Sequence, residues 1–194
     1  MPRPSREPEI LEAALACFAD FGYDATRVKH IAGRAGVSEA ALYRHHASKE
    51  AVALALFATH MRRFSDALAA VAGDHDRPVA ERIRALVRAS LSLRAEDPDA
   101  HAFVLGHQGR FLSALPADFP YPIRIVERLL GEGQADGTVR DGPVRLLSAL
   151  VLGCMNWPAI VAQHARAGSI DLGDPAAVAL IADGAWAAVA ASAG

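Results

Sequence analysis

The stretch TRVKHIAGRAGVSEAALYRHHASKE, residues 26–50, decides how the N-terminal part of the chain folds. Val28 and Ile31 have the spacing of apolar residues on the inner face of a short helix. Gly36 interrupts that helix, and Ser38 can cap a second short helix. Two short helices joined by a glycine-containing turn form a helix-turn-helix, whose second helix has an outer face free to enter the major groove of DNA.

Charge is distributed unevenly along the chain. The 194 residues carry a formal net charge of −2 and have a pI of about 6.4, so the overall composition does not indicate a nucleic-acid partner. Residues 26–50, in contrast, contain five basic residues and two acidic ones. A local excess of positive charge fits a patch that contacts DNA phosphates. On charge alone, an ordinary solvated pair of helices explains the pattern equally well.

The remaining apolar residues also have helical rather than alternating spacing, and no strand or internal repeat is expected. Further helices are predicted over residues 10–21, 48–72, 83–93, 98–112, 122–135, 143–167 and 175–191. The sequence therefore predicts an all-α fold. A three-helix head at residues 1–50 is joined by a long helix to a larger helical body at residues 51–194.

Three motifs within residues 8–57 resemble the tetracycline-repressor (TetR) family of bacterial regulators. They are F-x-x-x-G-Y, I-A-x-x-A-G-V-S and L-Y-x-H-x-x-S-K-E, in this order and spacing. The resemblance implies a cytoplasmic transcriptional regulator, most often a repressor, that binds a palindromic operator in double-stranded DNA as a homodimer. It implies a DNA-binding head, and a body that forms the dimer and binds a small-molecule effector coupled to DNA binding. No cofactor and no catalytic residue is expected.

The resemblance also assigns roles to single residues. Tyr43 and Lys49 match positions that hold DNA phosphates, and His45 matches a position that contacts backbone or base. Chemically, Arg44 can bind guanine through two hydrogen bonds, and Glu39 can accept one from cytosine. The complete set of residues expected at the DNA is Arg27, Lys29, Ser38, Glu39, Ala40, Ala41, Tyr43, Arg44, His45 and Lys49.

Two positions depart from the family pattern. His46 stands at a position that is usually aromatic and that normally packs under the recognition helix. Arg27 stands where a small hydroxyl residue is common, which shifts the expected helix cap to Thr26. The basic arm at residues 2–6 can enter a minor groove, although a disordered terminus is the commoner explanation of such a segment.

A ligand site is expected in the body. Phe103, His107 and Phe111 lie at positions i, i+4 and i+8 and share one helical face. Together with Asn156 and Trp157 they would give apolar walls with a few polar tips, as small-molecule sites have. The alternative, an ordinary core stripe, more often explains such a pattern.

The last two predicted helices are strongly apolar, and two such helices from each of two copies can form a four-helix interface across a two-fold axis. The predicted interface residues are Leu150, Gly153, Ile160, Val161, Ile181, Ala185, Trp186 and Val189. An intrachain core is the alternative. Residues 146–165 carry no Asp, Glu, Lys or Arg and are long enough to span a bilayer, but polar residues such as Asn156 and Gln163 favour a buried helix without a membrane.

Other chemistries receive little support from the sequence. His101, His107, Asp97 and Asp99 suggest a metal, yet Asp97 is better explained as a helix cap and the histidines do not share a face, so no metal is expected. Cys17 and Cys154 are predicted to be buried thiols in a reducing compartment.

Two other function classes remain as alternatives. An enzyme would need a nucleophile elbow, a phosphate-binding glycine loop or a paired metal motif, and we find none in the sequence. A helical interaction protein that no longer binds DNA stays open because of Glu39 on the reading face and His46 beneath it.

Overall fold

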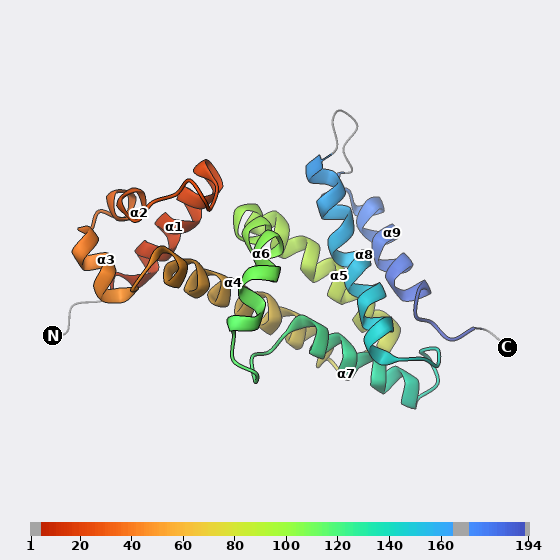
Figure 1. Ribbon diagram of the computed structural model, residues 1–194. Coiled ribbons are helices and arrows are strands. Elements are labelled where there is room, and N and C mark those ends of the chain that lie inside the picture. The colour runs from red at the N-terminus through yellow and green to blue at the C-terminus, as the bar shows by residue number, and fades with distance from the viewer. Residues whose placement is uncertain (1–4, 165–170, 193–194) are drawn as a thin grey trace. The chain divides into compact units, whose positions relative to one another are not determined.

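The structure, a computed structural model, describes residues 5–164 and 171–192, which are almost entirely helical (Figure 1). The helices are α1 (Glu7–Phe21), α2 (Val28–Ala35), α3 (Glu39–His45), α4 (Lys49–Ala72), α5 (Val79–Glu96), α6 (Pro98–Phe111), α7 (Pro122–Ala135), α8 (Val144–His164) and α9 (Pro175–Ala187), with a 3₁₀ turn at Leu112–Ala114. Within these residues the only extended pairing is a single antiparallel bridge between Val139 and Ala190. The predicted all-α fold is confirmed.

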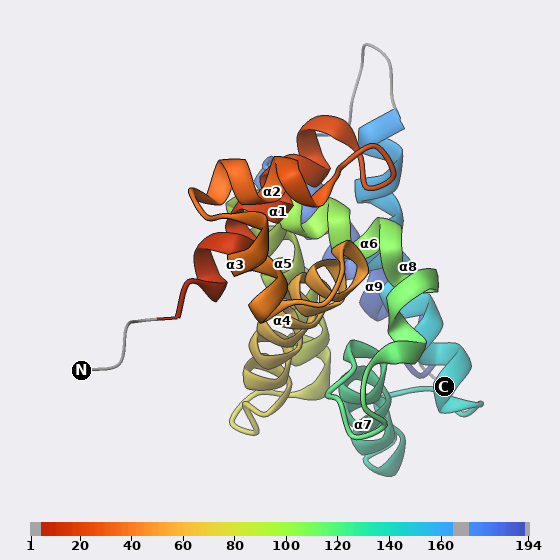
Figure 2. The same cartoon turned by 60° about the vertical axis from the view of Figure 1, so that its left-hand side comes forward.

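The chain divides into two compact units. Unit 1 is Met1–Met61 together with Asp97–Phe119, and unit 2 is Arg62–Glu96 together with Pro120–Gly194. In unit 1, α1, α2 and α3 gather around the first turns of α4 (Figure 2). α6 also belongs to unit 1, although it lies far from the helix-turn-helix in sequence. The functional boundary expected after residue 50 stays a prediction.

The core of unit 1 follows from the spacing of apolar residues on α1. Ile10, Ala14 and Cys17 recur on one face and are fully or almost fully buried. Gly22 ends the helix with a φ of 76°, a backbone conformation that favours glycine. The hydroxyl of Thr26 donates to the carbonyl oxygens of Cys17 at 3.0 Å and Gly22 at 2.7 Å. Thr26 therefore stabilises the end of α1.

The expectation that Thr26 caps α2 is wrong, because its hydroxyl is committed to α1. Arg27 occupies the cap position of α2. Its backbone N–H donates to Nδ1 of His30 at 3.2 Å, so a side chain in the first turn of the helix satisfies the donor. Arg27 keeps its own side chain exposed.

Unit 2 has a separate core, in which α5 packs on α9 and α7 packs on α8. Ile83, Leu86, Leu130 and Val151 are fully buried there, and each such side chain contributes about 1.5–3 kcal/mol to stability. Gly133 lets the chain after α7 approach closely, because a Cβ at this position would collide with the side chain of Val139.

α8 is the most apolar long helix. It is long and apolar enough to cross a membrane by length and composition, and 28% of that stretch is buried in the chain itself. It continues through Pro158 to His164, and the predicted end at residue 167 lies outside the described residues. α9 ends at Ala187 rather than at the predicted residue 191, since the chain then turns into the bridge at Ala190.

Candidate nucleic-acid interface

The turn between α2 and α3 is built by two residues with special backbone roles. Gly36 adopts φ 64° and ψ 33°, a left-handed conformation that costs glycine little. The Oγ atom of Ser38 accepts a hydrogen bond from the N–H of Ala41 at 3.1 Å and caps α3. Ile31 on α2 and Leu42 on α3 are fully buried, which fixes the inner faces of both helices. The helix-turn-helix predicted from the sequence is thus present.

The outer face of α3 is exposed over its whole length. Tyr43 is 50% exposed although it is a large aromatic residue. The exposed side chains of this face also include Glu39, Ala40, Arg44 and His45, while Ala41 is half-buried. No helix of unit 1 covers these side chains, so the residues expected to read DNA bases are available to do so.

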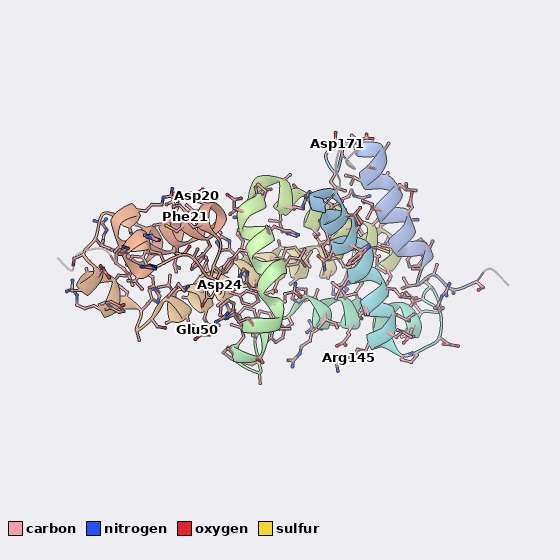
Figure 3. All side chains as sticks on the ribbon, turned by 45° about the horizontal axis from the view of Figure 1, so that its top comes forward. Asp20, Phe21, Asp24, Glu50, Arg145 and Asp171 are labelled. Carbon is pink, nitrogen blue, oxygen red and sulfur yellow. The ribbon has the colours of Figure 1, made fainter. Side chains whose placement is uncertain are left out.

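The five basic residues of the motif divide into two groups. Among the described residues, no hydrogen bond or ion pair joins the side chains of Arg27, Lys29 or Arg44 to another group, and all three are exposed. Arg34 instead donates to Asp20 at 2.6 Å. Asp20 lies at the C-terminal end of α1, next to Phe21 (Figure 3). Three cations are therefore free to contact phosphates or bases.

Lys49 is the second basic residue with partners inside the protein. Its Nζ atom donates to the carbonyl oxygens of Tyr23 at 2.8 Å and Asp24 at 3.2 Å. It also lies 4.5 Å from the centroid of the Tyr23 ring. In this structure the ammonium group that was expected at a DNA phosphate joins the start of α4 to the loop between α1 and α2.

His46, at the residue after α3, packs where the family usually has an aromatic side chain. The ring is buried, and its Nε2 atom lies 3.7 Å from Oε1 of Glu7 without a hydrogen-bond partner. Burial lowers the pKa of His46, while the carboxylate of Glu7 opposes the shift. At physiological pH the buried side chain at this position is therefore a neutral imidazole.

The arm before α1 is only partly described, and residues 2–4 lie outside the described residues. Arg6 donates to the carbonyl oxygen of Ala35 at 3.1 Å and pairs with Glu9 at 3.3 Å. Its guanidinium group therefore caps the C-terminal end of α2.

The residues expected to bind a ligand fall into different units. Phe103, His107 and Phe111 belong to unit 1, and Asn156 and Trp157 belong to unit 2. In unit 1 the ring of Phe103 stacks on Phe18 with centroids 5.3 Å apart, and Phe111 lies 5.7 Å from Phe57. Phe103 and Phe111 are buried in these contacts, which is the arrangement of a core stripe.

The sequence did not predict this aromatic cluster, because its members come from distant helices. Tyr23 joins it from the loop after α1, with its ring 5.5 Å from His107 and 6.1 Å from Phe111. His107 is itself held by a contact of 2.8 Å between Nδ1 and the carbonyl oxygen of Phe103. A helical stripe shows that residues are buried, but not which partner buries them.

An exposed apolar stripe runs along α8 of unit 2. Trp157 is 64% exposed. The other large apolar side chains of α8 and α9 that are exposed are Leu146, Leu150, Val161 and Leu180. Leu146 and Leu180 were not predicted, although Leu146 precedes Leu150 by one helical turn and so shares its face.

The predicted interface residues divide between this exposed face and the core. Leu150, Gly153 and Val161 are exposed, and Ile160, Ile181 and Trp186 are half-buried. The prediction is wrong for Ala185 and Val189, which are fully buried in the core of unit 2 and cannot contact a second chain directly.

Among the described residues no group of three or more His, Cys, Asp or Glu side chains gathers at metal-binding distance. Asp97 caps α6, since its Oδ1 atom accepts a hydrogen bond from the N–H of Ala100 at 3.0 Å. Burial raises the pKa of both thiols, Cys17 and Cys154, so they are protonated at neutral pH.

The N-terminal residues of the chain are similar in sequence to a known family of proteins. Residues 10–56 match the bacterial regulatory proteins of the tetR family. The transcriptional activator FasR of Mycolicibacterium smegmatis is 43% identical over 61 residues, 31% of this chain and 28% of FasR. The transcriptional repressor KstR2 of Mycobacterium tuberculosis is 52% identical over 46 residues, 24% of this chain and 23% of KstR2. The similarity thus spans less than a third of these relatives.

Solved structures resemble the fold over nearly the whole chain. A TetR family transcription regulator from Marinobacter aquaeolei has a TM-score of 0.77 at 23% identity, and the match covers 96% of both chains. FadR of Bacillus subtilis in complex with stearoyl-CoA has a TM-score of 0.75 at 21% identity, covering 94% of this chain and 97% of FadR. At this identity the likeness concerns the fold alone.

Proposed function

We propose that the whole chain is a homodimeric, sequence-specific transcriptional regulator whose DNA binding responds to a small molecule. Residues 10–56 match the bacterial regulatory proteins of the tetR family. The observation that carries the proposal is the outer face of α3. Tyr43, Arg44 and His45 are exposed there, on a helix held in register by Gly36 and Leu42. This face has the side chains that read base edges and has no partner in its own unit.

Free positive charge next to this face supports DNA as the partner. Arg27 and Lys29 at the start of α2 are exposed and unpaired within the described part of the chain, and Arg44 extends the same positive charge onto α3. Arg44 suits a guanine, while Arg27 and Lys29 suit flanking phosphates. Glu39, in the first turn of α3, can accept from cytosine and so contributes to base selection.

The test is binding of the purified chain to the DNA that flanks its own gene, at two salt concentrations and with excess competitor DNA. We expect tight binding to one palindromic site that survives competitor and weakens steeply with salt. Salt-insensitive association, or equal affinity for every sequence, would overturn the proposal. The absence of DNA binding at either salt concentration would favour the helical interaction protein that no longer binds DNA.

A second copy of the chain is the proposed occupant of the exposed stripe on α8 and α9. A soluble monomer rarely exposes a continuous row of large apolar side chains such as Leu146, Leu150 and Trp157. Gly153 lies in the same row and allows two backbones to approach closely. Two heads in one dimer also explain how a short recognition helix reads a palindrome.

For the effector, the proposal is a small molecule bound by the helical body. FadR, a structural neighbour, was solved with stearoyl-CoA, so long-chain acyl-CoA thioesters are the first compounds to test. Thermal stabilisation of the chain by such a compound, with a change in operator affinity, would support the assignment. The pocket of Phe103, His107, Phe111, Asn156 and Trp157 stays a prediction. One face of the Phe103 ring is already occupied by Phe18, with ring centroids 5.3 Å apart.

The named relatives differ in the direction in which they control transcription. The relatives named above are transcriptional regulators. FasR is an activator and KstR2 a repressor, so the direction of control has to be measured on the chain's own promoter. A reporter fused to that promoter, with and without the gene for this chain, distinguishes the two.

A further inference from the structure

Two buried serine side chains of unit 2 have hydroxyl groups without a hydrogen-bond partner. Ser65 on α4 is 0% exposed and Ser90 on α5 is 1% exposed, and the Oγ atom of each makes no hydrogen bond among the described residues. A buried hydroxyl in this state is unfavourable, because it gives up its hydrogen bonds to water and gains none in return. Such groups are rare in folded proteins, so two of them in one unit require an explanation.

Ser148 shows how another buried serine of unit 2 satisfies its hydroxyl within its own helix. It is fully buried on α8, and its Oγ atom donates to the carbonyl oxygen of Val144 at 2.9 Å. This bond to the preceding helical turn is open to serines inside helices in general. Ser65 and Ser90 also lie inside helices, yet neither makes it. Their hydroxyls are therefore available to a bound molecule.

The two serines lie at similar heights along a helical hairpin. The end of α4 and the start of α5 meet where Arg82 donates to the carbonyl oxygen of Ala72 at 2.8 Å. Ser65 precedes Ala72 by seven residues, and Ser90 follows Arg82 by eight. At a rise of about 1.5 Å per residue, each serine lies about 10–12 Å from this contact along its helix. One oxygen atom with two lone pairs can accept from both hydroxyls at this height.

The side chains next to the two serines are apolar. On α4, Leu68 lies one helical turn after Ser65 and shares its face. On α5, Leu86 and Val87 lie one turn before Ser90. All three are fully buried and belong to the core of unit 2. The serines therefore place two polar atoms in apolar walls, as small-molecule sites do.

The core of unit 2 offers no free positive charge to a ligand. Among the described residues of unit 2, Arg82 is the one charged side chain that is buried. Its guanidinium group already donates to the carbonyl oxygen of Ala72 and to Glu132. A carboxylate or phosphate in this core would stay unbalanced, which is strongly unfavourable.

This inference rests on the proposed function, in which the helical body binds an effector. We propose that Ser65 and Ser90 hold the polar end of that effector, and that the effector is an uncharged, largely apolar molecule with a ketone, ester or hydroxyl oxygen. This oxygen accepts hydrogen bonds from both serines, and the apolar remainder packs against the neighbouring leucine and valine side chains. A free carboxylate is excluded from this site, and an acyl-CoA can use it only with its charged head group outside the core.

Two probes of equal carbon number test the charge requirement. Methyl heptyl ketone carries one uncharged oxygen, whereas nonanoate carries a carboxylate. In isothermal titration calorimetry with the full chain at neutral pH, the ketone should bind at least about tenfold more tightly than nonanoate, because only the carboxylate has to be buried without a cation. Nonanoate that binds as tightly as the ketone, or a ketone that does not bind up to its solubility limit, would overturn the proposal.

Serine variants locate the bound ketone. Ser65→Ala and Ser90→Ala should each weaken its binding about threefold to tenfold, the usual effect of one lost hydrogen bond. Ser148→Ala is the matched control, since it removes a buried hydroxyl that is already bound to Val144, and it should bind the ketone as the parent does. If Ser65→Ala and Ser90→Ala keep the parental affinity, the proposal is wrong.

Thermal unfolding of the free chain gives a second measurement. Without a ligand, Ser65→Ala and Ser90→Ala each remove an unsatisfied hydroxyl and should raise the thermal midpoint by about 2–4 °C, whereas Ser148→Ala should not raise it. A lowered midpoint in both would show that these hydroxyls are bonded within the chain, and would overturn the proposal. None of these measurements uses DNA. If the chain has no preferred DNA site, the proposed function fails, and ketone binding still decides whether the two serines form a site.

Discussion

Nε2 of His46 lies 3.7 Å from Oε1 of Glu7, and this contact joins the residue after the recognition helix to the first turn of α1. The imidazole is buried, and its Nε2 atom has no hydrogen-bond partner among the described residues. Burial lowers the pKa of His46 from its ordinary value of 6.5; Glu7 opposes this shift and His45 adds to it. The native head therefore prefers a neutral His46.

Acid should destabilise unit 1 through this one side chain. An unfolded chain takes up a proton at His46 near pH 6.5, and the native chain does so only at lower pH. The contribution of His46 to the free energy of unfolding is therefore complete above about pH 6.5 and is lost as the pH falls from there toward the lowered native pKa. In His46→Phe, the difference in thermal midpoint between pH 7.5 and pH 5.5 should be smaller than in the parent.

His45→Gln is the matched control for this measurement, because it removes an exposed imidazole from the neighbouring position. It should reduce the pH dependence of the thermal midpoint much less than His46→Phe does, because His45 is the smallest of the three causes that shift the pKa of His46. An unchanged pH dependence in His46→Phe would show that the ring does not titrate differently in the native state.

Lys29 and Arg34 on α2 offer a second matched pair. Lys29 is exposed and unpaired among the described residues, while Arg34 donates to Asp20 at 2.6 Å. Lys29→Gln should lower the salt slope of operator binding by about one, and Arg34→Gln should leave it unchanged. Both substitutions remove one positive charge, so long-range electrostatics cancels in the comparison. Equal slopes for the two variants would contradict the division of the cations into free and paired groups.

The features that the sequence predicts correctly are local. Gly36, Ser38 and Asp97 are expected to form a turn and two helix caps, and each makes its backbone contact within a few residues. Such contacts are set by neighbours along the chain, so the sequence alone specifies them. The expectation for Thr26 is wrong because its partners, the carbonyls of Cys17 and Gly22, depend on how α1 ends.

Contacts between distant segments cannot be predicted in the same way. The sequence shows that Phe103 and Phe111 share one face of a helix. It does not show that Phe103 stacks on Phe18, because Phe18 lies on α1, far from Phe103 in the sequence. α9 is apolar on most sides, so its pattern does not show which face turns inward. For this reason Ala185 is expected at an interface and lies in the core, whereas Leu180 is 75% exposed.

Gly133 should tolerate no side chain. A Cβ at this position would collide with Val139, and Val79 also lies close. Gly133→Ala is expected to lower the free energy of unfolding by about 1–3 kcal/mol, the usual cost of overpacking a core. Gly131→Ala on the same helix meets nothing within 4 Å and should raise it by about 0.5–1 kcal/mol. Urea unfolding measures the free energy of unfolding of both variants. A Gly133→Ala variant as stable as the parent would contradict the prediction and would mean that the segment at Val139 can move away.

Arg82 should be more important for stability than Arg84, although both are in ion pairs on α5. Arg82 is 4% exposed, pairs with Glu132 at 2.7 Å and also donates to the carbonyl oxygen of Ala72 at the end of α4. Arg82→Met removes the donor to that carbonyl and leaves the Glu132 carboxylate with only His75, at 3.8 Å, among the described residues, and it should cost about 2–3 kcal/mol. Arg84→Met breaks an exposed pair with Asp183 and should cost under about 1 kcal/mol. Similar destabilisation of both variants in urea unfolding would refute the distinction.

The exposed stripe on α8 makes a prediction about the oligomeric state. Trp157 is 64% exposed in the single chain, so a partner chain can bury most of its ring. In sedimentation velocity experiments over a range of concentrations the parent should be a dimer. Trp157→Asp should dissociate it at a cost of at least about 2 kcal/mol, as expected for a central tryptophan. Arg88→Glu, on the exposed side of α5, should remain dimeric.

The monomeric Trp157→Asp variant should keep its circular dichroism spectrum but lose affinity for the palindrome, because one head then contacts one half-site. A parent that sediments as a monomer, or one that binds phospholipid vesicles through this stripe, would show that a second copy does not occupy it.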